Sequence, residues 1–371
     1  MKIAVNTRLL IKNHLDGIGR FSLETLKRIT KNNPQIEFHF IFDRQFSKDF
    51  IFSNNIIPHI LYPPTRHPFL WYIWFEYRLP NLINKKIKPD LFLSPDGFLS
   101  TRIKAPSIAV IHDINFEHRP QDLAWFHSKF YRIYFKKYAQ IAKHIVTVSK
   151  FSKKDIVKTY DIKENKIIVV YNGVSEQFKP ISEREKKIIK KRITNNVDFF
   201  LFVGSLHKRK NIKNLFLAFE IYKQNHGGNK LVIIGKRKWW DKKTENVFNS
   251  MKYKKDVIFL GQVDEKKMPL ILASAKALCF VSLFEGFGLP IVEAMKSGVP
   301  VITSNTSSMP EIAKDAAIIV DPHDVVSISK SMSEIDQDNQ LRKNLINLGL
   351  KRSQIFNWDL TSAKIAKLFE F

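Results

Sequence analysis

The chain of 371 residues has little cysteine, little acidic charge and no long apolar run, and each shortage excludes a class of protein. Its one cysteine, Cys279, cannot form a disulfide within the chain, so we expect a reducing compartment. No stretch reaches the ~18 charge-free apolar residues of a membrane span, and the run 268–284 is interrupted by Lys276. Residues 1–8 lack an apolar core of signal-peptide length. We therefore expect a cytoplasmic protein.

Acidic residues are outnumbered, because 61 Lys and Arg face 35 Asp and Glu and give a formal net charge of +26. Such an excess favours an anionic partner: nucleic acid, lipid headgroups or a phosphorylated substrate. The chain is also rich in lysine, isoleucine, asparagine and phenylalanine, as AT-rich coding sequence produces. Base composition therefore explains the charge equally well, and charge alone leaves the partner open.

What the chain does have is a repeated alternation of short apolar runs with helix-like segments. The first series of predicted strands is 3–6, 38–42, 91–94, 107–112, 143–149 and 167–171. A charged helical segment, 181–192, separates it from the second series, 199–203, 230–234, 257–260, 278–283, 299–303 and 317–320. Strands alternating with helices indicate parallel sheets covered on both faces. Two such α/β domains place a ligand cleft between them.

The most informative segment is 285–293, which holds two carboxylates eight residues apart. It follows an apolar strand, contains a glycine turn and enters a helix, so it offers free backbone N–H groups to a phosphate. We expect Glu285 on the turn and Glu293 in the first helical turn, where both carboxylates accept sugar hydroxyls. Glycine turns are nevertheless common in α/β proteins, and a Glu near a helix N-terminus is favourable by itself. Spacing alone leaves both interpretations open.

This segment resembles the E-x7-E signature of retaining glycosyltransferases with the GT-B fold, the large family 4 group. The resemblance covers nearly the whole chain, including 148–174 and 308–322. It implies two doubly wound, Rossmann-like domains facing a central cleft: an acceptor domain at 1–180 and a nucleotide-sugar donor domain at 181–355. It also implies a terminal helix, 356–371, that packs back on the N-terminal domain.

The resemblance implies roles for individual residues. Glu285 contacts donor-sugar hydroxyls, Glu293 contacts the ribose, Lys210 neutralises the donor diphosphate, and His112 lies near the reacting sugar. The remaining residues expected to contact the donor are Gly17, Gly19, Ser205, Arg209, Gly286, Phe287, Gly288 and Leu289. Ser205 departs from the family, because many members carry an arginine there, and Arg209 can substitute. By themselves, the basic run 207–210 also fits a solvated loop and Gly17-Ile18-Gly19 a plain strand–helix turn.

Two stretches mix basic and aromatic residues, 62–78 and 236–243. Their composition is typical of a membrane-interface segment, and it equally fits a buried helix beside a loop. We expect the N-terminal domain to bind anionic membrane through Arg66 to Arg78, with Trp71 and Trp74 as anchors if they are exposed.

The resemblance thus implies an enzyme that moves a hexose, mannose from GDP-mannose, to a glycan or lipid-linked acceptor in cell-surface polysaccharide synthesis. Mannose rests on residues 204–211. No cofactor or metal is expected, because no His, Cys and Asp cluster has metal-ligand spacing and a helix dipole with Lys210 serves the phosphates. Peripheral association with the inner membrane face is compatible with this function. The alternatives are a GT-B epimerase, against which the E-x7-E spacing counts, and a basic nucleic-acid-binding protein, for which no binding motif is present.

Overall fold

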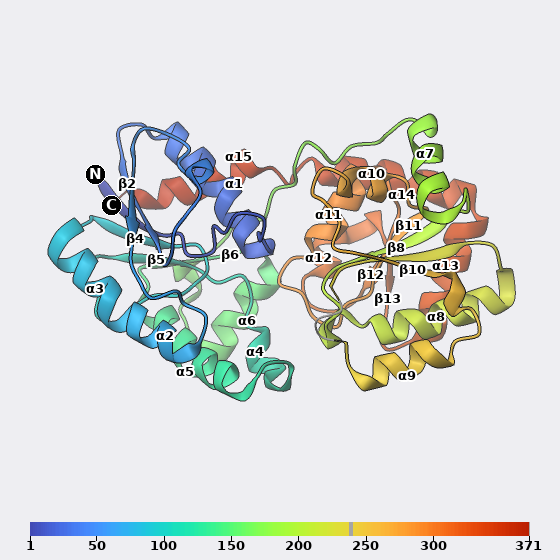
Figure 1. Cartoon of the computed structure of the whole chain (residues 1–371), viewed down its shortest axis with the longest axis horizontal. Helices are drawn as coiled ribbons and strands as arrows, with labels where there is room; N and C mark the ends of the chain where they lie inside the picture. Colours follow the sequence, from blue (N-terminus) through green and yellow to red (C-terminus); the bar gives the residue numbers. More distant parts are fainter. Residues whose placement is uncertain (237–239, 371) are drawn as a thin grey trace. The chain divides into compact units, whose positions relative to one another are not determined.

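The computed structural model describes residues 1–236 and 240–370, and the chain divides into two compact units (Figure 1). The first unit comprises Met1–Gly173 together with Asn357–Phe371, and the second comprises Val174–Phe356. The chain therefore passes from the first unit to the second and back again.

The first unit is built on a seven-stranded sheet in the order β3-β2-β1-β4-β5-β6-β7, in which all pairs are parallel. Its strands are β1 (Lys2–Asn6), β2 (Glu37–Phe42), β3 (Ile56–Ile60), β4 (Leu91–Ser94), β5 (Ser107–Val110), β6 (His144–Thr147) and β7 (Ile167–Val169). The order reverses between β1 and β4, which are neighbours in the sheet although β2 and β3 come between them in sequence. Such a reversal is the topological switch point at which open α/β sheets bind ligands.

Helices connect these strands. They are α1 (Gly17–Asn32), α2 (Pro68–Ile73), α3 (Leu79–Asn81), α4 (Asn115–His118), α5 (Trp125–Ile141), α6 (Lys150–Tyr160) and α15 (Trp358–Ala366), with π-helical segments at Trp74–Arg78 and Leu82–Ile87. Short 3-10 turns are η1 (Lys48–Phe50), η4 (Pro120–Asp122), η5 (Glu164–Lys166) and η10 (Lys367–Phe369).

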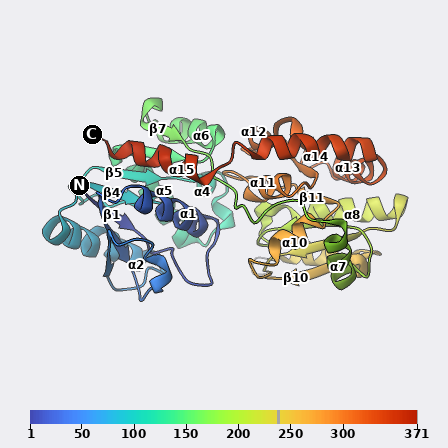
Figure 2. The ribbon, with the colours of Figure 1, turned by 90° about the horizontal axis from the view of Figure 1, so that it is seen from above.

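The last helix, α15, lies beside α1 in both views (Figures 1 and 2). Asn357 caps it by accepting from the Asp359 and Leu360 N–H groups. The Arg28 Nε of α1 lies 2.7 Å from Asp359 Oδ1. A Cβ at Gly173 would lie 2.3 Å from the Trp358 nitrogen, so only glycine allows the chain to approach the start of α15 this closely.

The second unit contains a six-stranded, all-parallel sheet in the order β10-β9-β8-β11-β12-β13. Its strands are β8 (Phe199–Val203), β9 (Lys230–Ile234), β10 (Val257–Gly261), β11 (Ala277–Phe280), β12 (Val301–Ser304) and β13 (Ile318–Val320). Its helices are α7 (Glu183–Thr194), α8 (Ile212–His226), α9 (Lys242–Ser250), α10 (Met268–Ala273), α11 (Leu289–Lys296), α12 (Met309–Ala313), α13 (Val325–Gln337) and α14 (Asn339–Ser353), with 3-10 turns η6 (Lys208–Lys210), η8 (Lys254–Asp256) and η9 (Lys314–Ala316). The reversal of order here falls between β8 and β11.

The predicted alternation of strands and helices is confirmed, and the differences have local causes. The edge strand β3 escaped prediction because Pro58 interrupts its apolar run, and proline is tolerated only at a sheet edge. The strand predicted at 278–283 ends at Phe280, since the residues after it turn toward the next helix. The charged segment 181–192 corresponds to α7, where Ser182 and Glu185 form a capping box.

The two tryptophans of the aromatic stretch 62–78 belong to the hydrophobic core. Trp71 is 7% exposed and Trp74 is fully buried. Their indole N–H groups donate to the Thr65 and Leu61 carbonyls, so both polar tips are satisfied inside the protein. The expectation that these tryptophans anchor a membrane is therefore wrong. The second stretch, 236–243, lies partly outside the described residues, at 237–239. Within the parts described, no helix is both long and apolar enough to cross a membrane.

Candidate functional site

The candidate site of the second unit lies at its switch point, where β8 and β11 end side by side. The 3-10 turn η6 follows β8 and carries Arg209 and Lys210. Glu285 follows β11. Because the carboxyl ends of neighbouring parallel strands meet at one edge of the sheet, residues 75 positions apart in sequence come together, as the Arg209 to Phe284 contact illustrates.

Glu285 lies between the two cations. Its Oε2 is 2.9 Å from Arg209 Nη1, and its Oε1 is 2.7 Å from Lys210 Nζ. All three side chains are largely buried, with Glu285 9% exposed. The Lys210 ammonium also lies 4.7 Å from the centroid of the Phe280 ring. One carboxylate thus balances two cations, and the cluster carries a net positive charge suited to a phosphate.

The charge state of Glu285 follows from this arrangement. Burial by itself would raise the pKa of its carboxyl group, but Arg209 and Lys210 outweigh burial and lower the pKa below its ordinary value. Glu285 is therefore ionised at neutral pH and acts as a hydrogen-bond acceptor. A carboxylate in this state can accept hydrogen bonds from the hydroxyl groups of a sugar, but it cannot act as a general acid.

The turn after Glu285 is fixed by serine hydroxyls that sequence analysis did not single out. The Glu285 N–H donates to Ser307 Oγ at 3.0 Å, and Ser308 Oγ donates to the Glu285 and Phe287 carbonyls. Both serines lie just before α12, within the stretch 308–322 or directly beside it. No spacing rule links them to Glu285, because the contact depends on β12 lying next to β11.

Gly288 is the N-cap residue of α11 and has a positive φ of 98°, a conformation that favours glycine. Because Gly288 precedes the helix, α11 begins at Leu289, and its first turn contains no acidic residue. Glu293 is therefore in the second turn of α11, and the expectation that it lies in the first turn is wrong. Gly286, Phe287 and Gly288 form the strand–helix turn as predicted in position, and Phe287 is packed edge-on against Phe356.

The loop after β8 is also held by hydrogen bonds to the segments that follow neighbouring strands. Asn211 occupies the N-cap position of α8, but its side chain makes no capping bond. Its amide Nδ2 instead donates to the Val281 and Pro322 carbonyls, which ties the loop to the ends of β11 and β13. Ser205, at the family's arginine position, is exposed. Arg209 is the residue that reaches Glu285, which fits the suggested substitution.

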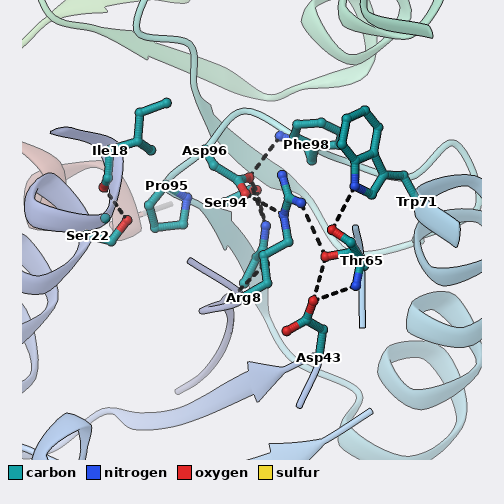
Figure 3. A network of polar contacts seen from close by, with 12 residues as sticks. Arg8, Ile18, Ser22, Asp43, Thr65, Trp71, Ser94, Pro95, Asp96 and Phe98 are labelled. Carbon is teal, nitrogen blue, oxygen red and sulfur yellow. Dashed lines mark hydrogen bonds and ion pairs between the residues drawn. The ribbon is translucent and has the colours of Figure 1, made fainter. Parts of the chain in front are cut away.

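A second polar cluster lies at the switch point of the first unit (Figure 3). Arg8 follows β1, and its Nε lies 2.6 Å from Asp96 Oδ2, which follows β4. The ion pair is buried, and the guanidinium stacks 4.2 Å from the Phe98 ring centroid. Arg8 also donates to Thr65 Oγ1, which in turn donates to Asp43 at the end of β2. The network thus joins the ends of β2, β1 and β4, three adjacent strands.

His112 extends this network to the next strand, β5. Its Nε2 lies 2.9 Å from the Pro95 carbonyl, and since a carbonyl only accepts, Nε2 carries the proton. Burial lowers the pKa of the imidazole despite the Pro95 carbonyl and the nearby carboxylates of Asp113, Asp96 and Asp16, which raise it. The ring is therefore neutral at pH 7, and its Nδ1 is an acceptor. Asp96 holds the loop that presents the Pro95 carbonyl by accepting from Ser94 and the Phe98 N–H.

The glycines of 17–19 open α1 in the same unit. Asp16 is the N-cap of α1, and its Oδ1 accepts from the Gly19 N–H at 2.8 Å. Gly17 is exposed, whereas a Cβ at Gly19 would lie 3.1 Å from the Leu9 carbonyl oxygen. The α1 helix meets His112 through Phe21, whose ring is 4.8 Å from the imidazole and perpendicular to it. Asp113 accepts from the Asn115 N–H and caps the next turn.

The structure therefore groups the predicted residues in two sets. Glu285, Arg209 and Lys210 form one contact cluster with the glycine turn beside it, and His112 lies against α1 in the other unit. Arg8 and Asp96 were missed, because neither lies in a motif and they are 88 residues apart. Across residues 1–236 and 240–370, no group of three or more His, Cys, Asp or Glu could hold a metal ion.

Comparison with known proteins supplies the family context. The description "Glycosyltransferase Family 4" matches residues 15–178, and "Glycosyl transferases group 1" matches residues 183–352. O-antigen chain mannosyltransferase B of Escherichia coli is 28% identical over 366 residues, which cover 94% of each protein. Sucrose-phosphate synthase from Thermosynechococcus elongatus has a TM-score of 0.78 at 16% identity, covering 100% of this chain and 98% of that one. HepE of Anabaena, solved with UDP-glucose, has a TM-score of 0.76 at 15% identity and 99% coverage of both chains.

Proposed function

The chain belongs to the group 1, family 4 glycosyltransferases, and from this membership we propose that it moves mannose from GDP-mannose to a glycan or lipid-linked saccharide. Its E. coli relative is named as an O-antigen mannosyltransferase, which supports both the sugar and a role in cell-surface polysaccharide synthesis. The α/β fold with two doubly wound sheets agrees with the GT-B class predicted from the sequence.

The observation that carries the proposal is the cluster of Arg209, Lys210 and Glu285 at the β8–β11 switch point. Two cations beside one carboxylate match a donor that has a diphosphate next to a polyhydroxy ring. In our proposal Arg209 and Lys210 neutralise the diphosphate, while the ionised Glu285 accepts hydroxyls of the transferred sugar. The contacts strengthen as negative charge builds on the leaving phosphate and positive charge on the sugar, so they lower the barrier.

The remaining predicted residues have supporting roles in this proposal. Glu293 binds the ribose, and the turn from Gly286 to Leu289 packs against the nucleotide. The neutral His112 offers Nδ1 to a sugar hydroxyl. We assign no protein base, because the leaving phosphate itself takes the acceptor proton in a retaining, same-face reaction.

We further propose that the reaction needs no metal ion, because two cations already serve the diphosphate. Activity in EDTA should then stay within about twofold of the untreated enzyme. Complete loss on chelation that Mg²⁺ or Mn²⁺ restores would refute this part of the proposal.

Donor identity can be tested by thermal shift, because a ligand that binds only the folded protein raises its midpoint. GDP-mannose, UDP-glucose and ADP-glucose are compared at equal concentration, each against its free nucleoside diphosphate. GDP-mannose should give the largest shift, and Lys210→Ala should abolish it. A larger shift with UDP-glucose would mean that UDP-glucose is the donor, and the proposed enzyme class would stay the same. Transfer is then followed with radiolabelled donor and membrane-extracted acceptor.

A further inference from the structure

Helix α5 of the first unit presents large apolar side chains to solvent at its start. Trp125 is 64% exposed and Phe126 is 63% exposed, and both stand in the first turn. Ile133 and Ile141 are exposed further along the same helix. The opposite side of α5 is ordinary core, where Phe130, Phe135, Tyr138 and other side chains are buried. The outward face is thus apolar in places where packing does not explain it.

The same outward face is cationic. The 17-residue helix contains Lys129, Arg132, Lys136 and Lys137, all exposed, and no Asp or Glu. The Lys129 ammonium lies 4.8 Å from the Trp125 ring centroid, so one cation and one aromatic ring form a single unit. Among the residues that the structure describes, a carboxylate pairs with only one of these four cations, Arg132, whose Nε lies 3.1 Å from Glu117 Oε2.

The face is also hollowed. A concavity of about 880 Å³ is lined by Trp125, Lys129, Arg132 and Lys136 of α5 together with Thr159 and Tyr160 of α6. Glu117, which pairs with Arg132, also lines it, so its walls combine aromatic rings, three cations, one carboxylate and hydroxyl groups, all from the first unit.

We propose that the outward face of α5 is the surface by which this protein docks on an anionic lipid bilayer. Trp125 and Phe126 would enter the boundary between headgroups and acyl chains, and the four cations would meet the lipid phosphates. At 1.5 Å per residue, the four cations from Lys129 to Lys137 extend over roughly 12 Å of headgroup surface. The proposal rests on the proposed function in one respect, because a lipid-linked acceptor would bring the enzyme to a membrane.

The mixture of aromatic and aliphatic side chains favours a bilayer over the other anionic partners. Nucleic acid binds by stacking bases on aromatic rings, and this explains Trp125 but not the aliphatic Ile133 and Ile141 on the same face. A bilayer uses both kinds of apolar group. The surface differs from the one expected from sequence, because Trp71 and Trp74 of the stretch 62–78 are buried.

The test is co-sedimentation of the full chain with vesicles of phosphatidylcholine alone or with 30% phosphatidylglycerol, a composition chosen for the assay. We expect binding to the anionic vesicles only, weakened by salt because the contacts lie at the surface. Each lysine near an anionic surface raises affinity about fivefold at low salt, so Lys136→Gln with Lys137→Gln should weaken binding on the order of 30-fold. Phe126→Ala should weaken it about tenfold through lost apolar contact.

The first unit offers matched controls. Lys85 and Lys86 are also adjacent and exposed, and Phe69 is 64% exposed, nearly the same as Phe126. Lys85→Gln with Lys86→Gln, and Phe69→Ala, should leave vesicle binding unchanged. Equal losses in test and control variants, or binding to neutral vesicles as strong as to anionic ones, would overturn the proposal. Loss with Phe69→Ala alone would move the surface to the 62–78 stretch, and tighter binding of single-stranded RNA than of vesicles would assign it to nucleic acid.

The two proposals fail separately. The α5 variants should keep the thermal shift with GDP-mannose, because none of these residues belongs to the donor cluster. Vesicle binding without any shift by a nucleotide sugar would leave the docking surface standing and remove the proposed donor. Nucleotide-sugar binding without vesicle binding would do the reverse.

Discussion

At the scale of single residues, Glu285 neutralises two buried cations and, in our proposal, accepts hydrogen bonds from a sugar. Glu285→Gln keeps the size of the side chain but leaves Arg209 and Lys210 without their counter-charge. Breaking one partner of a buried ionic cluster costs about 3–5 kcal/mol of unfolding free energy. We expect a lower thermal midpoint and a kcat reduced roughly 10²- to 10³-fold. Free GDP should bind the variant at least as tightly as wild type, since the diphosphate no longer competes with the carboxylate for the cations.

Calorimetric titration with GDP and steady-state kinetics measure these two effects independently. Turnover within threefold of wild type would remove Glu285 from the site. The matched control is Glu311→Gln, which changes a carboxylate in the same unit that is not part of this cluster.

Lys210 should behave in the opposite way toward the nucleotide. Its ammonium is the cation 2.7 Å from Glu285, and in our proposal it binds the diphosphate in both ground and transition states. Lys210→Ala should therefore weaken GDP binding and lower kcat/KM together. Lys208→Ala on the same 3-10 turn is the control, because Lys208 is exposed and its nearest carboxylate is Asp241, at 3.7 Å. Equal effects of the two substitutions would mean that Lys210 has no special role.

His112 makes the stability of the fold depend on pH with a defined sign. Burial lowers its pKa below the ordinary value of 6.5, so the folded state holds this ring neutral. Below about pH 6.5 the unfolded chain binds a proton that the folded chain resists, and the free energy of unfolding falls. His112→Gln keeps a donor for the Pro95 carbonyl and removes this proton uptake. The free energy of unfolding of wild type minus that of the variant should therefore be constant above pH 7 and fall toward pH 5.

Urea denaturation at several pH values gives both curves. His59, His127 and His144 also have lowered pKa values from burial and contribute with the same sign, so the wild-type slope does not vanish in the variant. Parallel curves for wild type and His112→Gln would contradict the assignment.

At the scale of elements, the ends of adjacent strands act together through the Arg8–Asp96 pair. Asp96→Asn cannot neutralise Arg8. Its amide has one acceptor oxygen, so it cannot accept from both Arg8 Nε and the Phe98 N–H, and the loop that presents the Pro95 carbonyl is held less firmly. We expect a loss of about 3–5 kcal/mol in unfolding free energy. We also expect His112 to populate both neutral tautomers instead of the Nε2–H form alone.

The ¹⁵N shifts of the His112 imidazole distinguish the tautomers without any substrate, with His112→Gln identifying the signal. Thr65→Val is the milder comparison, since it removes one 3.3 Å contact of Arg8 and leaves Asp96 in place. An unchanged tautomer in Asp96→Asn would show that the network serves stability alone.

At the scale of the whole molecule, the chain returns to its first unit through α15. Trp358, Ile365 and Phe369 of this terminal segment are each at most 3% exposed. Each fully buried apolar side chain contributes about 1.5–3 kcal/mol, so a chain ending at Phe356 should lose roughly 5–9 kcal/mol from the first unit. Calorimetry should show the transition of that unit lowered or absent and the transition of the second unit retained. The loss of both transitions together would mean that the units unfold as one.

A single substitution shows whether the loss of stability on truncation comes from the buried side chains or from shortening the chain. Ile365→Ala should destabilise the first unit by about 2–5 kcal/mol, whereas Leu360→Ala on the same helix should change little, because Leu360 is 56% exposed.

The sequence by itself determined the class of the fold and the position of the strand–helix turn that we propose binds the donor. Apolar period and turn residues are local properties, so the strands, the switch from Phe280 to Leu289 and the carboxylate Glu285 could be read along the chain. The basic loop at Lys210 was found in the same way. Local pattern erred at the edge strand β3, where Pro58 interrupts the apolar run, and at Gly288, which delays α11 and moves Glu293 to its second turn.

Only the tertiary structure decided which side chains meet and which face solvent. Arg8 and Asp96, or Glu285 and Ser307, become neighbours because non-consecutive strands lie side by side, and no local spacing encodes sheet order. Trp74 and Trp125 are each followed by a phenylalanine and, four positions on, by a basic residue, yet one is buried in the core and the other is exposed to solvent. Exposure is a property of packing between distant segments, so a sequence rich in aromatic and basic residues cannot by itself say where its surface lies.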